Sequence, residues 1–222
     1  MADPQATAFT AGEGDRYFER NAHLPDSYDP RADHVVRLLD SGGLTPASVI
    51  ELGAATGHRV AALVERWGCR GVAVDPSAAA TREGQRRFAE VEFVVGTLDA
   101  PSVSGAFDVV IVNFVFHWVG RSVLLSSVAA VDLLVADGGH LVIGDFLPAG
   151  FARTEYEHRL GLWTYKQDYA DVFCSSGLYG RVASLAGRYG GAMPCGDAAP
   201  MDRASYTLLH KSLDGYYQSV DL

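Results

Sequence analysis

The feature that most constrains this 222-residue chain is a regular alternation of short apolar runs with amphipathic segments. Apolar residues recur at helical spacing from Val60 to Trp67, and residues 76–90 and 121–136 also have helical patterns. Strands that alternate with helices form a parallel sheet with right-handed crossovers. The sequence therefore predicts an α/β fold with a doubly wound, mostly parallel sheet. Its predicted strands are 48–52, 70–75, 91–95, 107–113 and 139–145.

Two flanking regions do not follow this alternation. Residues 1–14 predict a flexible N-terminal arm, and helices are expected near 15–21 and 29–40. After the fifth strand, a helical lid insertion is expected, and 204–213 predicts a last strand, antiparallel at the sheet edge. We expect a single domain over 15–222, divided into cap helices (15–43), a core (44–146), a lid insertion (147–190) and terminal strands (191–222).

Composition excludes several classes of partner. The formal net charge is −9, from 27 Asp and Glu against 18 Lys and Arg. Acidic chains are repelled by phosphate backbones, so no nucleic acid partner is expected. The longest apolar run, 107–119, is too short and too polar to span a membrane, and the first residues lack a secretory signal pattern. Cys69, Cys174 and Cys195 are widely spaced without a CxxC motif, which favours a reduced, cytoplasmic setting.

A break after the first strand, in VIELGAATGHRVAAL (49–63), indicates a ligand site. Its small residues lie at the carboxyl end of a strand and before a helix, where ligands of parallel sheets bind. The stretch GAATG matches neither the dinucleotide-binding pattern GxGxxG nor a P-loop. This disfavours a nicotinamide-dependent dehydrogenase. Glu51 before the break and Asp75 after the second strand suit a cationic or hydroxyl-rich ligand. An acid at the second position can accept both hydroxyls of a ribose.

Five motifs in register carry a family resemblance. They are ELGAATG, VAVDPS, FVVGTLDAP, GAFDVVIVNFVFHWV and LLVADGGHLVIGDF, and their order and spacing hold from about residue 31 to residue 146. The chain thereby resembles the class I S-adenosylmethionine-dependent methyltransferases, which implies a Rossmann-like fold and S-adenosylmethionine as cofactor. One departure is Thr97, where the family often has Asp.

The resemblance implies roles for matching positions. Glu51 is expected near the methionine amino group, Asp75 on the ribose, and Asn113 near the methionine portion or the acceptor. Tyr28 or Arg31 could reach the cofactor carboxylate. The full cofactor site implied is Tyr28, Arg31, Glu51, Gly53, Ala54, Gly57, Asp75, Pro76, Thr97, Leu98, Asp99 and Asn113.

Two residues are candidates for proton transfer. His117 follows the fourth strand, and its ordinary pKa suits a general base, but it could equally pack the cofactor pocket. Asp145 ends the fifth strand and could act as base, orient the acceptor or cap the next turn. The histidines show no spacing typical of a metal site, so no metal is expected.

The stretch 151–170 is rich in aromatic and basic residues and predicts a lid over the acceptor. Arg153, His158, Arg159 and Lys166 concentrate positive charge, which favours an anionic acceptor. Tyr165 lies among them, and His158, Arg159, Tyr165 and Lys166 form the predicted substrate site.

The stretch HRLGLWTYKQDYADVF resembles bacterial methyltransferases of small-molecule and cell-surface-sugar pathways. We therefore expect methyl transfer to O or N of a small metabolite, for example in antibiotic biosynthesis. The alternative is a non-catalytic S-adenosylmethionine-binding regulator or partner protein. The aromatic flanks could also serve a homodimer interface.

Overall fold

The computed structural model describes residues 3–21, 28–191, 199 and 201–217. Its main element is a seven-stranded sheet in the order β3-β2-β1-β4-β5-β9-β8. Strands β1 to β5 pair in parallel, whereas β9 pairs antiparallel with both β5 and β8. This confirms the predicted mostly parallel α/β sheet. The strands are β1 (Ser48–Leu52), β2 (Arg70–Asp75), β3 (Val91–Val95), β4 (Phe107–Asn113), β5 (Val135–Phe146), β8 (Tyr179–Arg188) and β9 (Arg203–Lys211).

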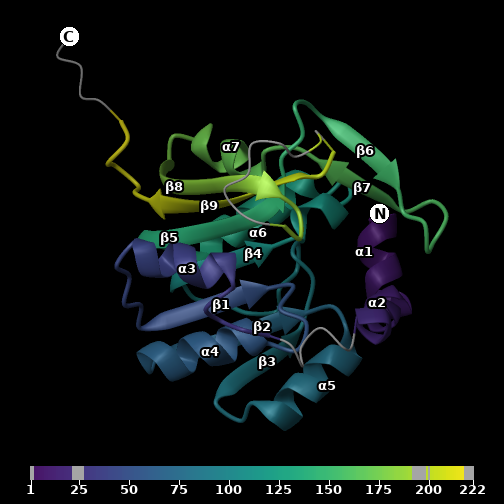
Figure 1. Ribbon diagram of the computed structural model, residues 1–222, viewed down its shortest axis with the longest axis horizontal. Helices are drawn as coiled ribbons and strands as arrows, with labels where there is room; N and C mark the ends of the chain where they lie inside the picture. The colour runs from purple at the N-terminus through teal and green to yellow at the C-terminus, as the bar shows by residue number, and fades with distance from the viewer. Residues whose placement is uncertain (1–2, 22–27, 192–198, 200, 218–222) are drawn as a thin grey trace.

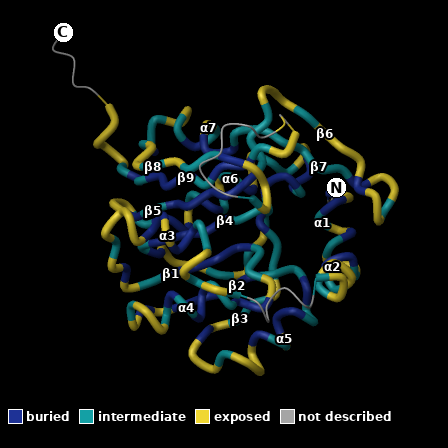
Figure 2. Tube along the Cα trace, viewed as in Figure 1, coloured by how far each residue is buried: buried dark blue, intermediate teal, exposed yellow. Residues whose placement is uncertain are grey.

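Helices cover both faces of the sheet (Figure 1). Successive residues of β1 serve opposite faces: Ile50 packs in the cluster that contains α6 and α7 residues, whereas Val49 packs with α3 and Leu63 of α4. Since both faces are covered, the central strands are mostly apolar, and most of their residues are buried (Figure 2). No helix in the described part of the chain is long and apolar enough to cross a membrane. The helices are α3 (His34–Ser41), α4 (His58–Trp67), α5 (Ala78–Arg87), α6 (Leu124–Leu134) and α7 (Tyr169–Cys174).

The N-terminal residues are folded, so the predicted flexible arm is wrong from Asp3 onward. They form α1 (Pro4–Ala8), the π-helical turn η1 (Phe9–Glu13) and α2 (Gly14–Asn21). Asp3 starts this segment by accepting hydrogen bonds from the N–H groups of Gln5 (2.9 Å) and Ala6 (3.1 Å). This segment has little apolar periodicity, because several of its anchoring contacts are made by polar side chains, described below.

The region after β5 contains a β-hairpin where the sequence predicts a helical lid. Strands β6 (Ala152–Glu155) and β7 (Trp163–Lys166) pair antiparallel. The helical spacing of Tyr156, Leu160 and Trp163 is misleading, because Tyr156 is buried while Leu160 is 87% exposed at the hairpin tip. Thr, Trp and Tyr in β7 favour a strand, and Gly161 turns the chain with a φ of +81°.

The antiparallel strand predicted at 204–213 is present as β9, but it does not lie at the sheet edge. Strand β8, which the sequence analysis did not predict, pairs with β9 and forms that edge. Its alternation is weak because much of it is half-buried or exposed, and a register shift between Arg181 and Ala183 interrupts the ladder.

Candidate functional site

A cavity of about 420 Å³ lies at the carboxyl ends of β1, β2 and β4. Figure 1 shows α1 and α2 on the side to which β1 and β4 point, and residues of this N-terminal segment also line the cavity. Arg31 is exposed and Gly57 lies behind the lining, so these two predicted residues do not reach the cavity surface. The predicted residues that do line it are Tyr28, Glu51, Gly53, Ala54, Asp75, Pro76, Thr97, Leu98, Asp99 and Asn113.

The turn after β1 is fixed tightly against β2. The N–H groups of Gly53 and Ala54 both donate to the carbonyl of Val74, at 2.7 and 3.0 Å. Gly53 has a φ of +80°, and a side chain there would collide with Val115. Gly57 meets the same two constraints, since its φ is +72° and a Cβ atom would lie 2.7 Å from the ring of Phe93.

Asp75 is held by the backbone on both carboxylate oxygens. Its Oδ2 accepts the Ala55 N–H at 2.7 Å, and its Oδ1 accepts the Ser77 N–H at 2.8 Å. Burial raises the pKa of Asp75 to about 6, although these two hydrogen bonds oppose the shift. A carboxylate can accept about four hydrogen bonds. Asp75 therefore has acceptor capacity left at the cavity surface.

Glu51 and Asn113 bring unpaired acceptors to the same cavity. Glu51 is 2% exposed, and its Oε1 accepts a hydrogen bond from Arg59, which also binds Asp33 through Nε at 2.9 Å. Glu51 Oε2 and Asn113 Oδ1 have no hydrogen-bond partner. Burial raises the pKa of Glu51 to about 7, against the effect of Arg59. Buried acceptors without donors are rare, so these two atoms indicate a ligand that donates hydrogen bonds.

Arg59 is a cavity residue that the sequence analysis missed. It is the one Arg or Lys among the described residues that line the cavity, and it is already paired with Glu51 and Asp33. The signal was present in the sequence, as a basic residue in the first turn of an apolar helix. A charge at the buried start of a helix is costly unless it is paired, so a basic residue at this position indicates a buried acidic partner.

Aromatic residues form another wall of the cavity. The Trp118 ring lies 5.4 Å from Phe9 and 6.3 Å from Tyr17, between ring centroids. Phe114 lies 4.8 Å from Tyr189, and both line the cavity. Phe9 comes from the segment predicted as an arm, Tyr17 from a predicted cap helix and Tyr189 from the predicted lid insertion. They could not be assigned from local patterns, because their meeting depends on long-range packing.

The structure brings the two predicted catalytic residues together, although neither lines the cavity. His117 Nδ1 lies 3.0 Å from Asp145 Oδ1, and the His117 N–H donates to Asp145 Oδ2 at 3.1 Å. Both side chains are buried. His117 lies in the 3₁₀ turn η3 (Phe116–Trp118), so this pair fixes the turn that carries Trp118.

The predicted substrate residues do not reach the cavity. Arg159 donates to the carbonyl of Ala8 at 3.3 Å and lies 3.9 Å from Glu13. His158 lies 3.3 Å from the carboxylate of Glu157. Both residues lie in the loop that joins β6 to β7. Arg159 is engaged with the N-terminal segment, whereas the contact between His158 and Glu157 is exposed to solvent.

The remaining basic residues of this stretch are also engaged elsewhere. Lys166 Nζ lies 3.9 Å from the centre of the Phe146 ring, and Tyr165 packs 4.3 Å from the guanidinium of Arg121. Arg153 stacks on Trp163 at 4.5 Å. The local positive charge thus stabilises the hairpin and gives no support to an anionic acceptor.

The charge of the cavity is acidic. Among the described lining residues, Glu51, Asp75 and Asp99 carry acids, against the single guanidinium of Arg59. No group of three His, Cys, Asp or Glu side chains in the described ranges is arranged to hold a metal ion. Cys69 is buried and Cys174 half-buried, both as free thiols, while Cys195 lies outside the described residues.

Comparisons with known proteins point to one family. A family model described as Methyltransferase domain matches residues 21–177. None of the curated proteins matches the sequence.

Several solved structures share the fold. One is 1,6-didemethyltoxoflavin-N1-methyltransferase from Burkholderia thailandensis, with a TM-score of 0.71 at 15% identity over 96% of this chain and 92% of that chain. Another is the N-methyltransferase NodS from Bradyrhizobium japonicum WM9, with a TM-score of 0.58 at 18% identity over 87% of each chain. A third is CalS10, an amino pentose methyltransferase from Micromonospora echinaspora, with a TM-score of 0.62 at 15% identity over 87% of this chain and 96% of that chain.

Proposed function

Because this chain belongs to the class I S-adenosylmethionine-dependent methyltransferase family, we propose that it methylates an O or N atom of a small molecule that carries no negative charge. One observation supports this most directly. Unpaired carboxylate and amide oxygens, the Asp75 carboxylate and an aromatic wall share a single cavity at the strand ends. These are the groups needed for an ammonium ion, a ribose and an apolar acceptor.

The residues at the strand ends fit the cofactor. The unpaired Oε2 of Glu51 and Oδ1 of Asn113 suit the methionine ammonium group, and Arg59 would balance its carboxylate. Asp75 would accept hydrogen bonds from the ribose hydroxyls. The adenine is assigned to the part of the lining formed by Thr97, Leu98 and Asp99.

When bound, S-adenosylmethionine supplies an electrophilic methyl group, so this chain need only position the acceptor, exclude water and manage one proton. Positioning alone can lower a barrier by several kcal/mol. Phe9, Trp118 and Tyr189 would hold the acceptor by ring contacts and would keep water away from the reacting atoms.

The charge of the cavity narrows the acceptor class. An anion would face Glu51, Asp75 and Asp99 with one cation, already paired, to offset them. Planar neutral or cationic molecules avoid this repulsion and gain from aromatic contacts. The named substrate of the Burkholderia protein, 1,6-didemethyltoxoflavin, and the amino pentose of CalS10 are consistent with a small acceptor.

The acceptor class can be tested with S-adenosylmethionine that carries a deuterated methyl group. Purified protein is incubated with two matched panels, one of neutral or cationic N-heterocycles, phenols and amino sugars, and one of carboxylates and phosphates. We expect label in the first panel, detected by mass spectrometry. Label confined to the anionic panel would overturn the acceptor class. S-adenosylhomocysteine binding without transfer to any compound would favour the non-catalytic binder.

We propose that His117 and Asp145 act as a positioning pair rather than as a general base, since both are buried behind the lining. Asp145→Ala removes the acceptor from three donors: the N–H groups of His117 and Phe146 and the imidazole. We expect a loss of about 2–4 kcal/mol in the free energy of urea unfolding, with S-adenosylhomocysteine affinity nearly unchanged. Unchanged stability with abolished methyl transfer would instead assign the pair to the reaction.

Cofactor affinity should depend on pH through Asp75. Its pKa is raised to about 6 by burial, so acid protonates it in the free protein. Ribose hydroxyls that donate to the carboxylate favour its ionised form, so binding must release a proton below pH 6. The affinity for S-adenosylhomocysteine should therefore fall as pH drops from 7 to 5. Asp75 contributes a slope that approaches tenfold per unit, and Glu51, whose pKa is raised to about 7, adds to the fall in the same direction. Calorimetric titrations check this, and Asp75→Asn should reduce proton release by one.

A further inference from the structure

The N-terminal segment, defined here as Asp3–Asn21, builds one side of the cavity. Phe9, Tyr17 and Phe18 all line it. The segment precedes the first strand of the sheet and pairs with no strand. What holds it in place therefore decides how well the cavity is enclosed.

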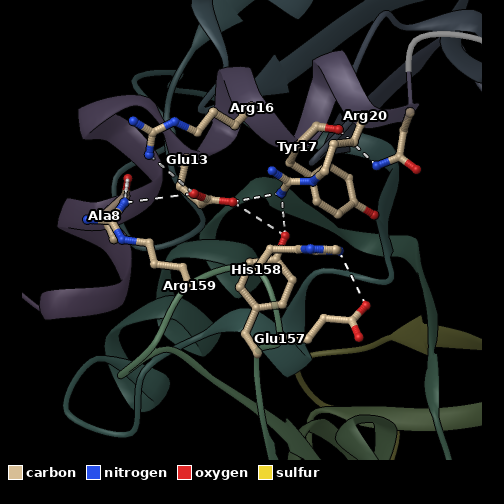
Figure 3. Close-up of polar contacts among 10 residues, drawn as sticks. Ala8, Glu13, Arg16, Tyr17, Arg20, Glu157, His158 and Arg159 are labelled. Carbon is tan, nitrogen blue, oxygen red and sulfur yellow. Dashed lines mark hydrogen bonds and ion pairs between the residues drawn. The ribbon is translucent and has the colours of Figure 1, made fainter.

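Glu13 lies at the centre of the contacts that hold this segment. Its side chain is only 1% exposed, which is unusual for a carboxylate outside a ligand site. Oε1 accepts from Arg20 at 2.7 Å and from the hydroxyl of Tyr156 at 3.4 Å. Oε2 lies 3.9 Å from Arg159 and 3.7 Å from Arg16. Figure 3 shows the three arginines converging on Glu13 from different directions.

Two of these partners come from the hairpin region, far away in the sequence. Tyr156 follows β6, and its hydroxyl also accepts a hydrogen bond from Arg20. Its ring packs 4.7 Å from Trp118 at the cavity wall. Arg159 additionally donates to the Ala8 carbonyl. The contacts of Glu13 thus join the segment to the hairpin directly beside the aromatic wall.

A second, independent anchor holds the segment on its other side. Asp15 Oδ1 accepts from the Ser77 hydroxyl at 2.6 Å and from the Ala79 N–H at 3.1 Å, at the start of α5. Between Glu13 and the first helix, Gly12 has a φ of +121° with no neighbour near its missing side chain. Loss of the Glu13 contacts would therefore loosen the hairpin side, where Gln5 Oε1 still accepts the Trp163 N–H at 3.0 Å, while Asp15 holds the α5 side.

We propose that Glu13 is a positioning residue that clamps the N-terminal segment to the β6–β7 hairpin and so sets how long a bound ligand is retained in the cavity. Removal of its charge would leave Arg20 and Arg159 facing each other without a carboxylate between them. The side chains of Arg20 and Arg159 are 33% and 37% exposed, so solvent screens part of their repulsion, and the remaining cost falls on the closed position of the segment. The link to retention of the cofactor rests on the function proposed above.

The test compares Glu13→Gln with the wild-type protein in two measurements. Hydrogen exchange should become faster in residues 3–21 while the amides of β1 and β4 keep their protection. The dissociation rate of S-adenosylhomocysteine, followed by stopped flow, should rise about tenfold, the effect of losing a charged hydrogen-bonded partner. Arg159→Gln, which removes the contact from the hairpin side, should shift both readouts in the same direction.

Arg16→Ala is the matched control. Arg16 also lies near Glu13 but its side chain is 66% exposed, so its removal should change neither readout. The clamp would be overturned if Glu13→Gln and Arg159→Gln both kept the wild-type exchange and dissociation rates. It would also be overturned if these variants lost protection equally throughout the sheet. If Glu13→Gln does not fold, Arg159→Gln decides. If the wild type fails to bind S-adenosylhomocysteine, the proposed function fails, while the exchange of residues 3–21 in the free protein still tests the clamp.

Discussion

Asp75→Asn is expected to raise the dissociation constant for S-adenosylhomocysteine about a hundredfold. Both carboxylate oxygens accept backbone N–H groups, from Ala55 and Ser77. An amide group has a donor on one side, so it must face one of these N–H groups donor to donor. The ribose would at the same time lose its charged acceptor, and hydrogen bonds to charged groups contribute about 1.5–3 kcal/mol each. Isothermal titration calorimetry at pH 8 measures the effect directly.

Asp108→Asn is a control that isolates the ligand part of this loss. Asp108 Oδ2 likewise accepts two backbone N–H groups, of Ala47 at 2.8 Å and Ser48 at 2.9 Å, but at the opposite end of the sheet. Because both N–H groups go to one oxygen, the carbonyl of Asn can still accept them, and we expect this variant to lose a little stability in urea from the lost charge while it keeps its affinity for S-adenosylhomocysteine. Equal affinity losses in both variants would show that Asp75 acts only through the fold and would remove it from the ligand site.

Gly53→Ala is expected to weaken S-adenosylhomocysteine binding at least tenfold and to lower the free energy of unfolding by about 1–3 kcal/mol. The φ of +80° strains any residue with a Cβ, at about 1–2 kcal/mol. The added methyl would also collide with Val115, a β-branched residue that lines the cavity and has few alternative rotamers. Val115 must then move relative to the turn that approaches the ligand.

Gly138→Ala separates the effect of backbone strain from the effect of the collision with Val115. Gly138 has a similar φ of +75°, but nothing lies within 4 Å of the added Cβ. Its alanine variant should show the strain alone, as a loss of stability without a change in affinity. Affinity is measured by calorimetry and stability by urea unfolding in both variants. If Gly53→Ala binds as well as Gly138→Ala does, close packing at the turn does not shape the ligand site.

The sequence was most informative where function depends on local order along the chain. Glu51 and Asp75 could be assigned because each follows or ends a short apolar strand, and parallel strands bring their carboxyl ends to one edge. The strand periodicity and the small residues around Gly53 are likewise local signals. For this reason the core of the sheet and ten of the twelve predicted cofactor residues meet at one cavity.

The acceptor side was not predictable in the same way. Arg159 reads as a free charge in the sequence, yet it is engaged by Glu13, which lies 146 residues earlier in the chain. Tyr189 reaches the cavity from the position directly after β8, a strand whose pairing with β9 has little periodic signal in the sequence. Such side chains acquire their roles from tertiary contacts, and the periodicity of a single segment carries no information about them.

The part of the chain that supplies the aromatic wall determines where the acceptor selectivity of this enzyme could be engineered. Phe9 and Tyr17 are supplied from outside the parallel strands, whereas Glu51 and Asp75 are built into them. Exchange of this terminal segment would therefore change the aromatic wall while the two carboxylates in the strands stay in place. A replacement segment would have to keep Glu13, because its contacts hold the segment against the hairpin.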